Sequence, residues 1–107
     1  MKVSIKPLSV NKCWQGKRFK TKDYKNYETE LLLKLKNIKI SDGKLKLNIT
    51  FGYSNQLNDI DNGLKPFIDI LQKKYKFNDR YIYELNVKKE IVKKGNEFIE
   101  FEINEIE

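Results

Sequence analysis

The chain changes from strand-like to helix-like spacing at Asp59-Ile60-Asp61-Asn62-Gly63-Leu64-Lys65-Pro66. Before this stretch, apolar and polar residues alternate over residues 45–51, which predicts a half-buried strand. Pro66 is best tolerated in the opening turn of a helix, so a helix cannot begin much before it, and Asp61 is its expected N-cap. Spacings of three and four then predict one apolar helix face, made of Leu64, Phe67, Ile68, Leu71 and Tyr75.

The same patterns extend outward along the chain. Alternation at Val3 and Ile5 predicts a short strand that ends at Pro7. We expect a basic loop over residues 8–21 and a helix over residues 21–38. Residues 81–87 and 99–103 alternate as strands, and the turn expected between them is a hairpin at Lys93-Lys94-Gly95-Asn96. The order β-α-β-α-β-β predicts a single domain over residues 1–107. Its fold class is α+β, a mixed or antiparallel sheet with two helices packed on one face.

Charge is divided unevenly between the two halves of the chain. The 22 Lys and Arg residues and 15 Asp and Glu residues give a net charge of +7. Residues 1–50 hold 13 basic and 4 acidic residues, a balance of +9, whereas residues 51–107 hold 9 and 11, a balance of −2. The N-terminal half is therefore expected to contact a polyanion.

Cysteine and histidine content limits the chemistry. One cysteine and no histidine exclude an intrachain disulfide and a thiolate zinc site, so any metal ligand must be oxygen. We find no apolar run of membrane-spanning length and no signal-peptide pattern at the start. We therefore expect a cytoplasmic protein without a membrane partner.

Carboxylates gather where the strand-like pattern ends. Asp59 and Asp61 are two residues apart, so their side chains can point the same way, and Lys65 is expected to stack over Asp61 one helical turn on. Two ionised groups about 5 Å apart repel by roughly 3 kcal/mol at an effective dielectric near 20, which a bound cation relieves. Oxygen ligands favour Mg²⁺ or Mn²⁺, and a third carboxylate, Asp79, follows the helix. In a basic protein this set suits phosphodiester hydrolysis.

Each of these residues also has a plainer interpretation. An Asp-x-Asp pair is typical of a loop with an N-cap, and Asp79 is typical of a turn. Trp14 fits a base-stacking side chain or a core anchor, and the basic run fits phosphate contacts or a solvated surface. The residues expected to bind DNA are Lys12, Trp14, Lys17, Arg18, Lys20 and Lys22.

Residues 59–71 resemble the D-x-D-N-x-x-K-P-x-x-D-x-L signature of RusA-type Holliday junction resolvases. Residues 77–85 resemble the segment that follows it in that family, and residues 7–14 resemble its P-x-x-x-N opening. The resemblance implies a small homodimeric endonuclease that cuts four-way DNA junctions with Mg²⁺ or Mn²⁺. The Lys- and Asn-rich composition and the small size fit a bacterial or phage-encoded protein. By position, Asp59, Asp61 and Asp79 match the catalytic, metal-holding carboxylates, and Lys65 matches the essential lysine.

Two departures from the family pattern stand out. Asn78 occupies a position where the family often has a second acidic residue, and residues 55–58 lack the arginines often found there. The second departure shifts the expected DNA contact toward the basic N-terminal segment.

The leading hypothesis is a metal-dependent, structure-selective endodeoxyribonuclease that cuts branched DNA in recombination and repair, with no small-molecule substrate. One alternative is a non-catalytic module that binds branched or single-stranded DNA on the same fold. Another is a broader nuclease that also cuts flaps and forks.

Overall fold

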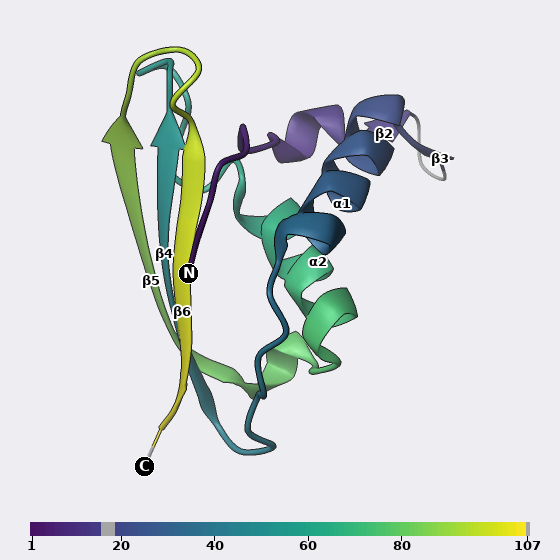
Figure 1. Cartoon of the computed structure of the whole chain (residues 1–107), viewed down its shortest axis with the longest axis vertical. Helices are drawn as coiled ribbons and strands as arrows, with labels where there is room; N and C mark the ends of the chain where they lie inside the picture. Colours follow the sequence, from purple (N-terminus) through teal and green to yellow (C-terminus); the bar gives the residue numbers. More distant parts are fainter. Residues whose placement is uncertain (16–18, 107) are drawn as a thin grey trace.

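The computed structural model describes residues 1–15 and 19–106. One layer is a four-stranded sheet, and two helices cover one of its faces (Figure 1). This arrangement confirms the predicted α+β class, the mixed sheet and the placement of both helices. The elements are β1 (Lys2–Val3), the 3₁₀ helix η1 (Val10–Lys12), β2 (Trp14–Gln15), β3 (Phe19–Lys20), α1 (Lys22–Lys34), β4 (Leu45–Tyr53), α2 (Leu64–Tyr75), the 3₁₀ helix η2 (Asp79–Tyr81), β5 (Ile82–Ile91) and β6 (Phe98–Glu105).

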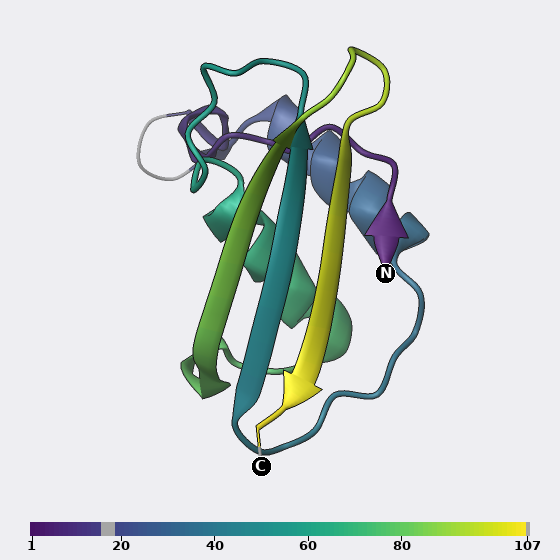
Figure 2. The same cartoon turned by 90° about the vertical axis from the view of Figure 1, so that its left-hand side faces the viewer.

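The sheet has the strand order β1-β6-β4-β5, with β4 between two long neighbours (Figure 2). β6 runs antiparallel to β4, whereas β5 runs parallel to it, and α2 forms the crossover between β4 and β5. The predicted hairpin between β5 and β6 is therefore wrong, because β4 separates them. A turn does form there, with the Asn96 amide donating to the Lys93 carbonyl at 2.9 Å and Gly95 at φ 97°.

β4 supplies the centre of the core, as its alternation predicts. Its odd-numbered side chains from Leu45 to Tyr53 are buried against the helices, and the intervening side chains up to Thr50 are partly exposed. Phe67 of α2 packs edge-to-face against Phe51 and Phe101, with ring centroids 6.1 and 5.3 Å apart. These contacts fix the angle and depth at which α2 crosses the sheet.

Both helices differ in detail from their sequence patterns. The Thr21 side chain accepts a hydrogen bond from the Tyr24 amide and caps α1, which ends at Lys34 rather than near residue 38 because Leu35 is already extended. On α2, the predicted face is displaced. Phe67 and Leu71 are buried as expected, together with Pro66 and Ile70, whereas Leu64, Ile68 and Tyr75 are only partly buried.

The basic N-terminal segment contains more regular structure than the predicted loop. η1 and the antiparallel pair β2–β3 occupy its described part, and the Thr21 amide donates to the Cys13 carbonyl at 2.9 Å. Among the residues described, no helix is both long and apolar enough to cross a membrane.

Candidate functional site

The segment between β4 and α2, residues 54–63, carries the acidic motif and is held at its C-terminal end by two hydrogen bonds. The buried Gly63 amide donates to the Tyr53 hydroxyl at 3.1 Å. The neighbouring Asn62 carbonyl accepts from the Val10 amide of η1 at 2.8 Å. Burial raises the pKa of Tyr53, so its hydroxyl stays protonated at neutral pH, and the Asp61 charge acts in the same direction. The loop is thus joined to both the sheet and the N-terminal segment.

Asp59 and Asp61 are both exposed on this loop. Their backbone carbonyls accept from the Asn62 and Leu64 amides, each at 3.1 Å, so two successive turns hold the pair in place. Within residues 1–15 and 19–106, neither carboxylate forms a salt bridge. Both side chains are therefore accessible to a cation and its water shell.

The N-cap prediction for Asp61 is wrong. The helix begins at Leu64, its N-cap is Gly63, and no side chain caps it. Pro66 lies third in the helix, where its missing amide hydrogen leaves no intrahelical bond unmade. The Asp61 carboxylate therefore forms no capping hydrogen bond with the helix.

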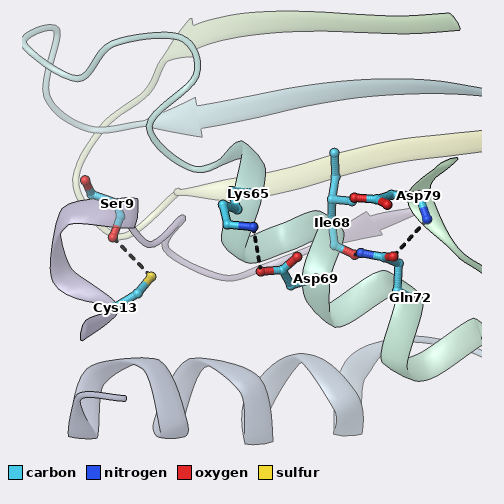
Figure 3. A network of polar contacts seen from close by, with 7 residues as sticks. All are labelled: Ser9, Cys13, Lys65, Ile68, Asp69, Gln72 and Asp79. Atoms are coloured by element: carbon cyan, nitrogen blue, oxygen red, sulfur yellow. Dashed lines mark hydrogen bonds and ion pairs between the residues drawn. The ribbon is translucent and has the colours of Figure 1, made fainter. Parts of the chain in front are cut away.

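Lys65 lies in the first turn of α2 and forms an ion pair with Asp69, at 3.7 Å (Figure 3). This pairing points one turn forward along the helix instead of back toward Asp61. Both groups are solvated, with side-chain exposures of 70% and 39%. Asp69 was not among the predicted site residues, although its i,i+4 spacing from Lys65 is a signal for such a pair.

Asp79 lies at the opposite end of α2 from Asp59 and Asp61. Its backbone amide donates to the Gln72 side chain at 2.8 Å (Figure 3). A helix of twelve residues, Leu64–Tyr75, is about 18 Å long, which is far beyond the reach of one metal's ligands. In the described part of the chain, no three acidic or thiol side chains are close enough to share a metal ion.

Two of the predicted carboxylates, Asp59 and Asp61, remain as candidate metal ligands within one chain. Mg²⁺ commonly takes one or two protein carboxylates and completes its shell with water and substrate phosphate. Asp59 and Asp61 fit that requirement because both are exposed oxygen donors on one short loop.

The residues expected to bind DNA lie on the N-terminal segment and the start of α1. Lys12 and Lys22 are exposed, and Trp14 is 45% exposed, which argues against a core-anchoring role for its indole. The Lys20 ammonium lies over the Tyr24 ring, 4.6 Å from its centroid. Lys17 and Arg18 lie outside the described residues.

Comparison with protein families confirms the resemblance seen in the motif. A family model described as "Endodeoxyribonuclease RusA" matches residues 8–103 of the 107. No protein with a curated description matches the chain.

Proposed function

The chain belongs to the RusA family of endodeoxyribonucleases, and we propose that it is a metal-dependent enzyme that cuts four-way DNA junctions by phosphodiester hydrolysis. One observation carries the proposal beyond family membership. Two exposed carboxylates without salt-bridge partners among the described residues stand on a braced loop, beside a solvated lysine at the start of a helix. Recombination and repair are the processes that such an activity would serve.

Asp59 and Asp61 would hold Mg²⁺ or Mn²⁺. When bound, the metal activates water and neutralises charge on the phosphate. The turns at Asn62 and Leu64 hold the backbone of both residues, so the two side chains would start from fixed positions on the loop when metal binds.

Lys65 would bind the scissile phosphate and stabilise charge that develops on it. Its pair with Asp69 does not prevent this, because an exposed salt bridge contributes only about 0–1 kcal/mol. A phosphate oxygen can therefore replace the Asp69 carboxylate at low cost. The start of α2 adds favourable dipole interactions with an anion.

The basic N-terminal segment would hold the DNA backbone. Its described members on the surface are Lys12, Lys20 and Lys22, and the sequence adds Lys17 and Arg18 between β2 and β3. Phosphate contacts of this kind are independent of sequence and weaken with salt.

We further propose a homodimer formed through β5, the open edge of the sheet. β5 spans Ile82–Ile91 and, among the residues described, pairs with β4 alone. Its side chains Tyr83, Leu85 and Ile91 are 62%, 45% and 52% exposed. A long strand edge with exposed apolar side chains is a template for pairing with another strand. An antiparallel two-fold pairing with Asn86 opposite its copy places Glu84 opposite the partner's Lys88, so the edge is complementary to itself in charge.

This dimer would bring Asp79 toward the acidic loop of the second copy. Asp79 immediately precedes β5, and Lys89 near the end of β5 donates to the Asn58 carbonyl at 2.7 Å, which places the acidic loop at that end. In an antiparallel pair the start of one strand lies beside the end of the other. Asp79 would then contribute to the site of the partner subunit, because it lies too far from the acidic loop of its own chain.

The nuclease proposal is tested with a synthetic four-way junction and a linear duplex, each in Mg²⁺ or EDTA. We expect junction nicking only with metal, its loss in Asp61→Asn, and wild-type nicking in Asp42→Asn, an exposed carboxylate in the turn before β4. Nicking that survives EDTA or Asp61→Asn would refute the proposal. Tight junction binding that is indifferent to metal, without nicking, would favour the non-catalytic module, and equal cutting of flaps and forks would favour the broader nuclease.

The dimer is tested by mixing two inactive variants, Asp61→Asn and Asp79→Asn. If Asp79 acts across the two-fold axis, mixed dimers regain one intact site, and about a quarter of all sites recover in a random mixture. A mixture as inactive as its parents, or a monomeric mass by light scattering, would exclude this dimer.

A further inference from the structure

A pocket of about 270 Å³ opens beside Lys65, between η1, β2–β3 and the first turns of α1 and α2. Its inner surface is formed by the buried residues Cys13, Tyr24 and Pro66. Lysines and one carboxylate, Asp69, surround the opening, and Trp14 forms one wall. Figure 3 shows Cys13 facing the side of α2 that carries Lys65 and Asp69.

The lining is suited to a flat, apolar group attached to an anion. The 45% exposed Trp14 indole supplies aromatic surface, and the buried Tyr24 ring lines the inner end of the pocket. Lys20 lies near both rings, 6.0 and 4.6 Å from their centroids.

Lys65 and Lys73 lie on the α2 side of the pocket, where each is paired with a carboxylate, Asp69 at 3.7 Å and Glu28 at 2.9 Å. A phosphate can replace a carboxylate in such solvated pairs at low cost. Aromatic surface with cations at its edge is how proteins hold single-stranded nucleotides, with the base stacked and the phosphate paired.

The size of the pocket limits its occupant. A volume of about 270 Å³ falls just below the roughly 300–1,000 Å³ of sites that hold drug-sized ligands, so it suits a single base rather than a base pair. The base must therefore be out of its stack. At a branch point this costs less than in continuous duplex, since unpairing is cheapest where stacking is already disturbed.

The pocket is structurally joined to the acidic loop. Lys65 lines the pocket and follows the acidic loop by two residues, and Val10, which also lines the pocket, donates its amide to the Asn62 carbonyl at 2.8 Å. A nucleotide whose base enters the pocket would leave its phosphate near Lys65, toward Asp59 and Asp61.

We propose that this pocket receives one unstacked nucleobase of the strand to be cut, stacked on Trp14 and flanked by Lys20 and Lys65. The inference rests on the proposed nuclease function and adds to it the recognition of an unpaired base next to the scissile phosphate. Because every base has an aromatic face, the pocket selects for an unpaired state rather than a sequence.

Trp14 makes the test direct, since it is the one tryptophan of the chain and its fluorescence reports on this pocket alone. We would titrate the protein in EDTA with a four-way junction, a single strand and a linear duplex. We expect saturable quenching by the first two and little by the duplex. Quenching should weaken when the branch-point nucleotides of the junction are abasic.

Substitutions at Trp14 distinguish base stacking from non-specific electrostatic attraction to DNA. Trp14→Ala should weaken junction binding by about 5- to 150-fold, the range for one base–aromatic stack, and Trp14→Phe should restore most of it. Leu33→Ala, at an 82% exposed position on α1, should bind as wild type. Circular dichroism would check that each variant is folded.

The results separate the two proposals. A protein that cuts junctions while its Trp14 fluorescence stays constant, and whose Trp14→Ala variant binds normally, overturns the pocket and leaves the nuclease intact. Quenching without any metal-dependent cutting overturns the nuclease and supports the pocket. Failure to bind any of the DNAs overturns both.

Discussion

Replacing Tyr53 by phenylalanine removes a single oxygen atom from beneath the acidic loop. That oxygen accepts the buried Gly63 amide at 3.1 Å, and the phenylalanine ring has no atom that replaces it as an acceptor. A buried amide without a partner costs about 1–3 kcal/mol, because it gives up water on folding and gains nothing in return. We therefore expect Tyr53→Phe to lower the free energy of unfolding by about 2 kcal/mol.

The chain offers a matched control for this change. The Tyr27 hydroxyl is also buried, but it has no hydrogen-bond partner among the described residues, although the Leu8 backbone and Tyr53 lie near it. Tyr27→Phe removes the same atom without breaking a hydrogen bond of the described structure. Its effect should be near zero or stabilising by up to about 1 kcal/mol.

Urea unfolding followed by circular dichroism measures both variants against the wild type. The difference between the two midpoints isolates the Tyr53–Gly63 hydrogen bond, since the lost oxygen is common to both. Equal effects of the two substitutions would refute the view that this bond holds the acidic loop in place. Junction cleavage by Tyr53→Phe at low urea should fall as well, because Asp61 lies only two residues from Gly63.

Three further predictions follow from the core and the loop. Phe67→Ala should cost about 3–5 kcal/mol in urea unfolding and Phe67→Leu no more than about 1.5, and similar losses for both would argue against tight packing at this fully buried ring. Gly63→Ala should cost about 1–3 kcal/mol, since its Cβ would stand 3.0 Å from the Tyr53 hydroxyl. Gly95→Ala in the open turn should cost about 1–2 kcal/mol for a different reason, because its φ of 97° strains any residue with a Cβ. Burial raises the pKa of the Cys13 thiol, so less thiolate exists at pH 8 in the folded protein than after unfolding. Reaction of Cys13 with a disulfide reagent should accordingly be slow until urea is added, and equally fast reaction in both states would contradict the burial.

The sequence predicted those features that depend on local periodicity. Alternation from Leu45 onward identified β4 because one face of that strand is buried along its whole length. The spacing around Phe67 and Leu71 identified α2, although Ile70 showed that the buried face is rotated from the predicted one. The motif residues could be recognised from the sequence because a motif is defined by the order and spacing of residue types along the chain.

Features set by strand pairing were not predictable in the same way. The turn residues at 93–96 predict only that the chain reverses direction there. They do not indicate whether β6 pairs directly with β5 or, as observed, lies on the far side of β4. The distance between Asp79 and Asp61 was not predictable for a related reason. The intervening sequence spans a rigid helix that keeps the two apart, instead of a loop that could bring them together.

The parallel pairing of β4 with β5 has a consequence for how quickly the acidic loop acquires its shape. Parallel neighbours cannot form as a hairpin, so the chain must close a loop before the first contact between them is made: paired positions such as Leu45 and Ile82 are 37 residues apart. The loop that carries Asp59 and Asp61 is part of that closure. We therefore expect the acidic loop to become ordered late in folding, when α2 docks on the sheet. A fragment that ends before Ile82 should not form the two turns that carry the carboxylates, even if it retains helix.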